Sequence, residues 1–197
     1  ENLQHIIGKK IKPANRDKVE SLELVDEAQK LDVALLVYGS PLTATTHISL
    51  LEEAKRLGVK YRIIYNASIL DAVAESGLQL YKFGKTASMP KFQKSYTPDS
   101  FIDIILQNEK IKAHTLLLTD IDLKPKQAIE QLEDTIKKRN IKIDKLIICS
   151  QIGTENAKIY FDKIGDLKKQ DIKMPFCIII PSELHFIEQE ALKILAQ

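Results

Sequence analysis

Apolar residues in this chain gather in short continuous runs, which are separated by longer segments that carry helix start and stop signals. The runs are Asp32–Tyr38, Lys60–Asn66, "HTLLLTDI", "DKLIICSQIGT" and "MPFCIIIPS". A short run that is apolar throughout, without alternation, is typical of a strand whose two faces are both covered, as in a parallel sheet. Helical segments between such runs predict an α/β protein.

The segment between the first two runs is predicted to be a helix. Thr45 or Thr46 is suited to cap its start, and Gly58 to end it in a left-handed turn. Strand, helix and strand together then form a βαβ unit. Ser68 is suited to cap a second helix, which we expect to run to about Leu80.

The character of the sequence changes in the middle of the chain. The stretch "YKFGKTASMPKFQKSYTPDSF" contains one glycine and two prolines, and it indicates a crossing between domains that includes one strand. The pair Thr97-Pro98 then favours a helix start, because a capping residue is followed by proline at the first helical position. A later helix is predicted to open in the same way at Pro125.

The rest of the chain adds elements of both kinds. The segment "AKIYFDKI" alternates between apolar and polar residues, which predicts an antiparallel strand. Glu183–Leu195 is predicted to be a closing helix. We therefore expect two α/β domains, residues 1–85 and 86–197, with a mainly parallel sheet in the first and a mixed sheet in the second.

Composition and charge indicate which kinds of molecule the protein is expected not to bind. Hydrophobic residues make up 44% and charged residues 28% of the 197 residues, which is ordinary for a globular protein. The 29 Lys and Arg residues are interspersed with 27 Asp and Glu residues, which favours a solvated surface over a nucleic-acid site. No signal peptide is visible, and no apolar run approaches the ~20 residues that span a bilayer. We expect a cytoplasmic protein that binds neither nucleic acid nor membrane.

The two cysteines suggest no special chemistry. Cys149 and Cys177 each lie inside an apolar run, which is typical of buried free thiols. The chain has no CxxC pair and no Cys/His spacing of the kind that binds zinc. We therefore expect no metal site.

Four strand ends supply candidate binding residues. In an open parallel sheet, ligands bind beyond the carboxyl ends of the strands, where backbone amides of the following helices add donors. Small or polar residues occupy four such ends: Gly39–Thr43, Asn66–Ile69, Thr119-Asp120 and Ser150–Gly153. Each alone resembles an ordinary strand end, but together they predict a small-molecule cleft between the two domains.

The residues themselves leave the chemistry open. The chain has no GxSxG, GxxxxGK[ST] or GxGxxG motif. A structural or surface role is the better interpretation for His47, His114 and His185. Asp120, at the end of a strand, fits a functional role and a capping or surface role equally well.

A resemblance to a known family goes further. The segments "GSPLTATTH", "YNASILDAVAESGLQLYKFGKT", "HTLLLTDI" and "PSELHFIEQEAL", in this order and spacing, resemble the diphthine synthase family of tetrapyrrole-methylase-like methyltransferases. The resemblance covers essentially the whole chain. Its most specific part is Asn66–Lys85, and within it "GLQLYKFGK", Gly77–Lys85, which is similar to a family signature.

The resemblance implies an activity and its partners. Members of the family bind S-adenosylmethionine (SAM) in a folded conformation between two α/β domains, release S-adenosylhomocysteine, and form homodimers. Their substrate is translation elongation factor 2, in which one histidine carries an aminocarboxypropyl group. The amino group of that histidine is methylated repeatedly to give diphthine, the precursor of diphthamide.

The resemblance also implies which residues contact the cofactor. Small residues in the first loop let the backbone approach the methionine portion of SAM. No catalytic residue is assigned, because the sulfonium is an activated methyl donor and the protein mainly has to align the acceptor amine. The implied cofactor contacts are Gly39, Ser40, Thr43, Ser68, Ile69, Thr119, Ile152 and Phe176.

The chain departs from the family pattern at several positions. Ser40 stands where the family has aspartate, and Phe176 stands where it has histidine. Ile152 makes the turn bulkier than the family's Ala-Arg-Ala-Gly, and the segment after Asp120 is shorter. Glu1–Val19 matches a stretch that follows the family's first strand and Gly-rich turn. We expect that element to come from upstream residues, a separate short chain or a partner subunit.

Two alternatives remain beside the diphthine-forming enzyme. One is a methyltransferase of the same fold that acts on a small macrocycle or RNA, and Gly77–Lys85 argues against it. The other is a degenerate protein that binds SAM or elongation factor 2 without turnover. Ser40 and Phe176 favour this second alternative.

Overall fold

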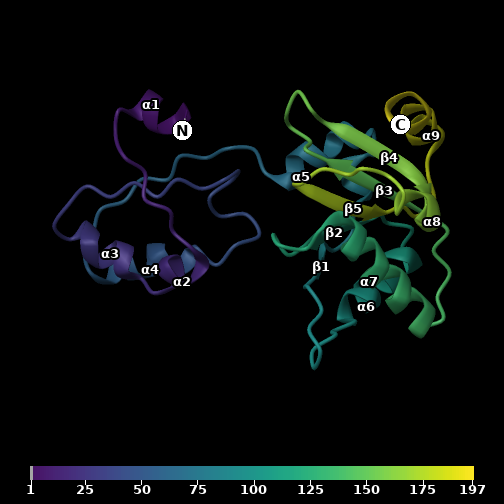
Figure 1. Ribbon diagram of the computed structural model, residues 1–197, viewed down its shortest axis with the longest axis horizontal. Helices are drawn as coiled ribbons and strands as arrows, with labels where there is room; N and C mark the ends of the chain where they lie inside the picture. Colours follow the sequence, from purple (N-terminus) through teal and green to yellow (C-terminus); the bar gives the residue numbers. More distant parts are fainter. Residues whose placement is uncertain (1) are drawn as a thin grey trace. The chain divides into compact units, whose positions relative to one another are not determined.

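The chain forms two compact units. A computed structural model describes residues 2–197, and their contacts divide at Ile69 and Leu70 (Figure 1). Residues 70–85 pack within the second unit. The predicted domains, 1–85 and 86–197, are those of the family fold. They are defined differently from these contact units, so they stay a prediction.

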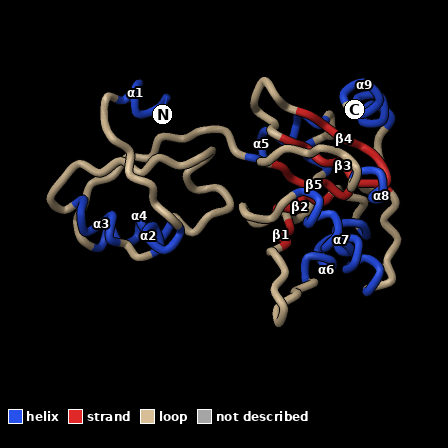
Figure 2. Tube along the Cα trace, viewed as in Figure 1, coloured by secondary structure: helices blue, strands red, loops and turns tan. Residues whose placement is uncertain are grey.

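The first unit consists of short helices joined by long loops (Figure 2). Asn15 caps the second of these helices, because its side chain accepts a hydrogen bond from the Lys18 N–H at 3.0 Å. The longest helix begins after His47, without the predicted threonine cap, and Gly58 follows its end with φ +68°. The helices of this unit are α1 (Asn2–Ile7), α2 (Arg16–Glu20), α3 (Glu23–Ala28) and α4 (Ile48–Arg56).

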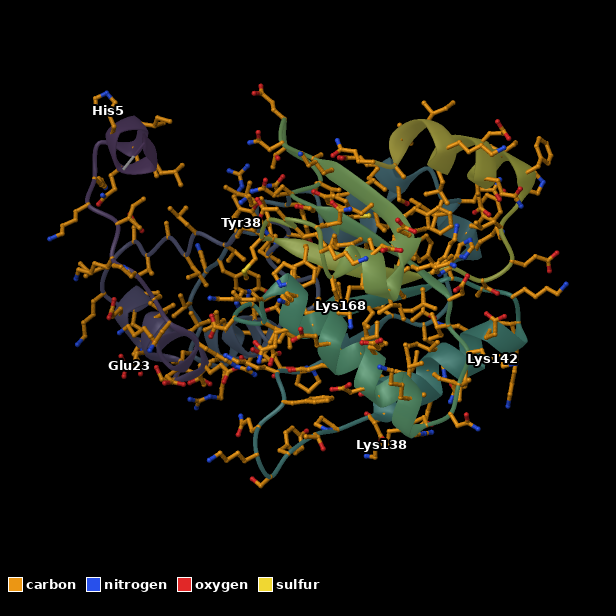
Figure 3. All side chains as sticks on the ribbon, turned by 45° about the vertical axis from the view of Figure 1, so that its right-hand side comes forward. His5, Glu23, Tyr38, Lys138, Lys142 and Lys168 are labelled. Atoms are coloured by element: carbon orange, nitrogen blue, oxygen red, sulfur yellow. The ribbon has the colours of Figure 1, made fainter. Side chains whose placement is uncertain are left out.

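The parallel sheet expected in the first unit is not formed by the residues described there. Asp32–Tyr38 and Lys60–Asn66 are not hydrogen-bonded strands in the described part of the chain. Their apolar side chains are largely exposed: Tyr38, labelled in Figure 3, is 83% accessible and Ile64 is 77% accessible. Two paired segments alone would form only a marginal sheet, and the described residues 2–69 contribute no strand to any sheet.

The second helix predicted from Ser68 also proves to be broken. Helix α5 (Ile69–Ala72) passes into the 3-10 turn η1 (Val73–Ser76), and Gly77 then adopts φ +79°. A left-handed residue ends the helix, because the next amide can no longer reach the carbonyl four residues back. A further 3-10 turn, η2 (Leu80–Lys82), follows.

The second unit contains the predicted mixed sheet. The described residues form one five-stranded sheet with strand order β1-β2-β5-β3-β4. β1 pairs with β2 in parallel, and the other neighbours are antiparallel. The α/β class is therefore confirmed. The strands are β1 (Ala87–Met89), β2 (Thr115–Thr119), β3 (Lys145–Ser150), β4 (Lys158–Lys163) and β5 (Phe176–Ile180).

Helices cover both faces of this sheet (Figure 1). Leu117, Ile148 and Ile178 point to one face, where they join the main core with α6 (Ser100–Lys110), α7 (Pro125–Lys138) and α8 (Ile164–Leu167). The opposite face, covered by α9 (Phe186–Leu195) and η1, buries Ile147, Ile179 and both cysteines. Burying one such aliphatic side chain contributes roughly 1.5–3 kcal/mol.

Ion pairs between the helices surround this core. Lys168, which follows α8 and is labelled in Figure 3, donates a hydrogen bond to Glu133 of α7. Pro125 opens α7 as predicted. None of the described helices is long and apolar enough to cross a membrane.

Candidate cofactor-binding site

Within the first unit, the loop after residue 38 lies against a second candidate segment. Gly39 has φ +82°, and a Cβ atom added to it would lie 3.5 Å from the Ala67 carbonyl oxygen. This conformation strains any residue with a side chain, so the turn favours glycine, whereas a Cβ atom would make only an ordinary contact with Ala67. Gly39 thus lies next to the segment that carries Ser68 and Ile69.

The same loop has its own internal hydrogen bonds. Thr43 Oγ1 donates to Ser40 Oγ at 2.9 Å, and both side chains are half-buried. His47 Nδ1 lies 2.7 Å from the Pro41 carbonyl oxygen, so this nitrogen carries the proton and donates it. The structural interpretation of His47 is therefore confirmed, and Ser40 and Thr43 form a paired set of hydroxyls.

In the second unit, Thr119 and Phe176 lie at the same end of the sheet. Thr119 ends β2 and Phe176 begins β5, and these two strands are antiparallel neighbours. Phe176 is also in register with Ser150 at the end of β3, and Ile152 follows two residues later. Thr119, Phe176 and Ile152 are each half-buried. Three of the predicted cofactor contacts therefore come from adjoining strand ends.

The turn after β3 is fastened to the segment that precedes β5. The Gln151 N–H donates to the Pro175 carbonyl at 2.8 Å, and Gln151 Nε2 donates to the Met174 carbonyl at 3.0 Å. Ser150 Oγ donates to the Lys173 carbonyl at 2.8 Å. These bonds fix the start of the turn relative to the strand that carries Phe176.

Asp120 has a structural role in the described fold. Its Oδ2 atom accepts a hydrogen bond from the Lys91 N–H at 2.8 Å, which ties the loop after β1 to the end of β2. The buried Gln131 side chain strengthens the same junction by donating to the Pro90 carbonyl and accepting from the Phe92 N–H. Asp120 is thus an exposed residue whose side chain holds a loop and does not cap α7, whose N-cap residue is Lys124.

The signature-like segment Gly77–Lys85 is held by a buried carboxylate that the motif search overlooks. Glu188 is fully buried and accepts hydrogen bonds from Lys82 Nζ at 2.6 Å and from the Gln79 N–H at 2.9 Å. It also accepts from the His185 N–H and from His114 Nε2. Burial raises the pKa of Glu188, but these hydrogen bonds together outweigh burial and lower the pKa to about 2.

His114 is a fixed, neutral member of this cluster. Its Nδ1 accepts the Ser182 N–H at 3.0 Å, so the proton lies on Nε2, which donates to Glu188. Burial lowers the pKa of His114, against the opposing effect of Glu188. His185 caps α9 in a capping box with Glu188. The structural interpretation of both histidines is therefore confirmed.

Two glycines let the signature-like segment lie close against neighbouring helices. A Cβ atom added at Gly77 would lie 2.5 Å from Ala191 Cβ of α9, and one at Gly84 would lie 2.2 Å from Asn108 Oδ1 of α6. Asn108 in turn accepts from the Lys85 N–H and donates to the Lys85 carbonyl. Gly77–Lys85 is thus a structural clamp between two helices.

Sequence reasoning missed the partners of this clamp. Glu188 stands three residues after His185, the spacing of a capping box, and that signal was readable. Asn108 gave no signal, because a polar residue in a helix usually faces solvent. Among residues 2–197, no group of three or more His, Cys, Asp and Glu side chains is arranged to hold a metal ion.

Comparison with known proteins places the chain in a family. Residues 4–168 match the family of Tetrapyrrole (Corrin/Porphyrin) Methylases. The diphthine synthases of Methanococcus aeolicus and Methanocaldococcus jannaschii are each 37% identical to the chain, over 210 and 212 residues. Each match covers 100% of the chain and 82% of the relative. A protein of Arabidopsis thaliana named probable diphthine methyl ester synthase is 36% identical, covering 98% of the chain and 80% of that protein.

Solved structures agree with the sequence matches. A crystal structure of diphthine synthase superimposes with a TM-score of 0.86 and 32% identity, covering 98% of this chain and 78% of that one. A protein from Entamoeba histolytica assigned as a diphthine synthase gives a TM-score of 0.88 and 30% identity, covering 100% and 81%. The chain therefore belongs to the tetrapyrrole methylase family and, within it, to the diphthine synthases.

Proposed function

We propose that this chain is a SAM-dependent methyltransferase that repeatedly methylates the amino group of the modified histidine of translation elongation factor 2, giving diphthine during diphthamide biosynthesis. Methyl transfer follows from membership of the diphthine synthases. The observation that carries the proposal is an identity of 37% that extends over the whole chain. We further propose that the protein works in the cytoplasm as a homodimer.

The first unit offers groups that suit the methionine portion of the cofactor. Gly39 lies beside Ala67 and has no side chain, so a ligand can approach its backbone directly. Ser40 and Thr43 present hydroxyls, which accept hydrogen bonds from an ammonium group. Ser68 and Ile69, both half-buried, complete this proposed set.

The second unit offers a mixed polar and apolar surface. Thr119 contributes a hydroxyl, while Ile152 and Phe176 contribute half-buried apolar side chains. Such a mixture is typical of small-molecule sites, in which a few polar groups orient a ligand held mainly by apolar contacts. These residues therefore fit a cofactor that has an adenine ring and a short amino-acid chain.

The chain needs few reactive side chains for this chemistry. When bound, SAM supplies a methyl group on a sulfonium centre, which is activated without help from a base. The protein then has to exclude water and to hold the neutral acceptor amine in line with the methyl group. Asp120 is engaged with the Lys91 N–H, so we assign it to holding the loop and not to proton removal.

The proposal is tested by incubating the protein with SAM and elongation factor 2 and measuring the mass of the factor. We expect stepwise methylation only where the target histidine already carries the aminocarboxypropyl group, because the accepting amine is absent from unmodified histidine. Unmodified elongation factor and tRNA are the negative controls. Equal methylation of either control would overturn the proposed substrate, and binding of SAM without any transfer would favour the degenerate protein.

A second possible product, the methyl ester of diphthine, is supported by the name of one relative. The Arabidopsis relative is named for a diphthine methyl ester, which requires methylation of a carboxylate oxygen as well as the amine. Mild base hydrolyses an ester and leaves N-methyl groups intact. Loss of one methyl group from the product after base treatment would therefore assign the ester to this chain, and an unchanged mass would assign diphthine.

A further inference from the structure

The turn that carries Ile152 is held by a carboxylate from a distant part of the chain. Glu75 Oε1 accepts a hydrogen bond from the Gly153 N–H at 2.8 Å, across a sequence separation of 78 residues. Glu75 belongs to η1, and both partners of this bond are exposed. Glu75 lies within the segment that carries the family resemblance, but the resemblance assigns it no role.

Ile152 lies between two residues with left-handed backbone conformations. Gln151 has φ +51° and Gly153 has φ +79°. A non-glycine residue in this region is uncommon, so the surroundings must hold it in place. The bonds from Gln151 to Met174 and Pro175 hold the turn on one side, and the bond from Gly153 to Glu75 holds it on the other.

The element that carries Glu75 is itself rigidly placed. Its neighbours Val73 and Ser76 are 2% and 0% accessible, so η1 is anchored on both sides of Glu75. Ser76 Oγ donates to the Val73 carbonyl at 2.7 Å. The backbone of η1 is thereby held in place, and the exposed Glu75 side chain reaches from it to the Gly153 N–H.

We propose that Glu75 is a positioning residue that fixes Ile152 for cofactor binding through its hydrogen bond to the Gly153 N–H. The inference rests on the proposed function, in which Ile152 contacts the cofactor. A carboxylate suits this role because hydrogen bonds to an ionised acceptor are shorter and stronger than neutral ones. Glu75 touches neither cofactor nor substrate in this role and acts only through the turn.

Three variants separate positioning from a general effect of charge. Glu75→Ala removes the acceptor, whereas Glu75→Gln keeps an acceptor oxygen at nearly the same place. Glu155→Ala removes a negative charge from the same exposed turn without touching the bond to Gly153. Both positions are exposed, so the melting temperature of all three variants should change little and serves as the check on folding.

The experiment is a calorimetric titration of the full chain and each variant with S-adenosylhomocysteine. We expect Glu75→Ala to weaken binding by about 5- to 10-fold, which is the scale of the net contribution of one ordinary hydrogen bond. Glu75→Gln should restore most of the affinity, and Glu155→Ala should match the wild type. The NMR shift of the Gly153 amide should move in Glu75→Ala and stay close to wild type in Glu155→Ala.

The outcomes that contradict the inference are distinct from those that contradict the function. Equal affinity of the wild type and Glu75→Ala would overturn the role of Glu75 and leave the proposed function standing. A similar loss of affinity in Glu155→Ala would show that the effect comes from charge, and it would also overturn the positioning role of Glu75. No binding of S-adenosylhomocysteine by the wild type would remove the proposed function, and this inference with it.

Discussion

At the scale of single residues, the first loop holds a hydroxyl where the family resemblance leads us to expect a carboxylate. Ser40 Oγ accepts a hydrogen bond from Thr43 Oγ1 in the described structure. A serine makes this local hydrogen bond but carries no charge. In the proposed site this leaves the ammonium group of the cofactor with a neutral partner.

We predict that Ser40→Asp tightens SAM binding by roughly 1–2 kcal/mol, the scale of one hydrogen bond to a charged group. A carboxylate at this position can still accept from Thr43 while pairing with the ammonium. Calorimetry with SAM measures the change. Ser40→Asn, which has nearly the same shape and no charge, is the matched control and should show little gain. An unchanged or weaker affinity in Ser40→Asp would mean that the loop is built around serine.

At the scale of elements, the contacts of Gly77–Lys85 explain why this segment is so distinctive. Gln79 and Lys82 are bound by Glu188 of α9, and Lys85 is bound by Asn108 of α6. Gly84 leaves the space that the Asn108 side chain fills. The segment therefore joins two helices from opposite faces of the sheet, which gives it a structural role. Leu80 and Tyr81 of the same segment are exposed and take no part in these contacts.

We predict that Gly84→Ala destabilises the second unit by about 2 kcal/mol, because the added methyl group overlaps the Asn108 side chain. Asn108→Ala should destabilise by a similar amount, since it removes the hydrogen bonds to the Lys85 backbone. Chemical denaturation measures both.

The double variant provides the control for this clash. In the Asn108→Ala background the same Gly84→Ala change meets no side chain, so its additional cost should fall under about 1 kcal/mol. A fully additive pair of losses would show that Gly84 is needed for some reason other than the space taken by Asn108.

At the scale of the whole molecule, the buried cluster of the second unit makes stability depend on pH. The pKa of Glu188 falls from an ordinary 4.5 to about 2 in the folded protein, so its contribution is complete above pH 4.5. The pKa of His114 is lowered from 6.5 by burial, so the unfolded chain takes up that proton first as the pH falls. Both groups therefore favour the folded state at neutral pH and lose that effect in acid.

We predict that the free energy of unfolding begins to fall below about pH 6.5 and falls further between pH 4.5 and about 2. The second step should amount to about 3 kcal/mol, which is the scale of the Glu188 shift. Urea denaturation at a series of pH values measures it. Glu188→Gln should be less stable at neutral pH and should show a smaller second step, to which ion-paired carboxylates such as Glu133, whose pKa is also lowered, still contribute. A wild-type stability that is flat down to pH 3 would contradict this account.

Much of the second unit was predictable from local pattern alone. Pro125 begins α7, "AKIYFDKI" forms the antiparallel strand β4, and the apolar runs became β2, β3 and β5. These signals work because a proline at a first helical position, or a run with two buried faces, acts on the residues that carry it. The family resemblance was equally a property of the sequence, because it needs only the order of residues.

Only the tertiary structure decided which residues hold those elements together. Glu188 reaches Gln79 across 109 residues, and Glu75 reaches Gly153 across 78. The helix expected from Ser68 stops at Gly77, which packs on Ala191 of the last helix. Likewise, Asp32–Tyr38 and Lys60–Asn66 carry apolar runs but are not paired as strands in the described structure. A strand exists only when a neighbour supplies the opposing hydrogen bonds, and a distant partner leaves no mark on the local pattern of the sequence.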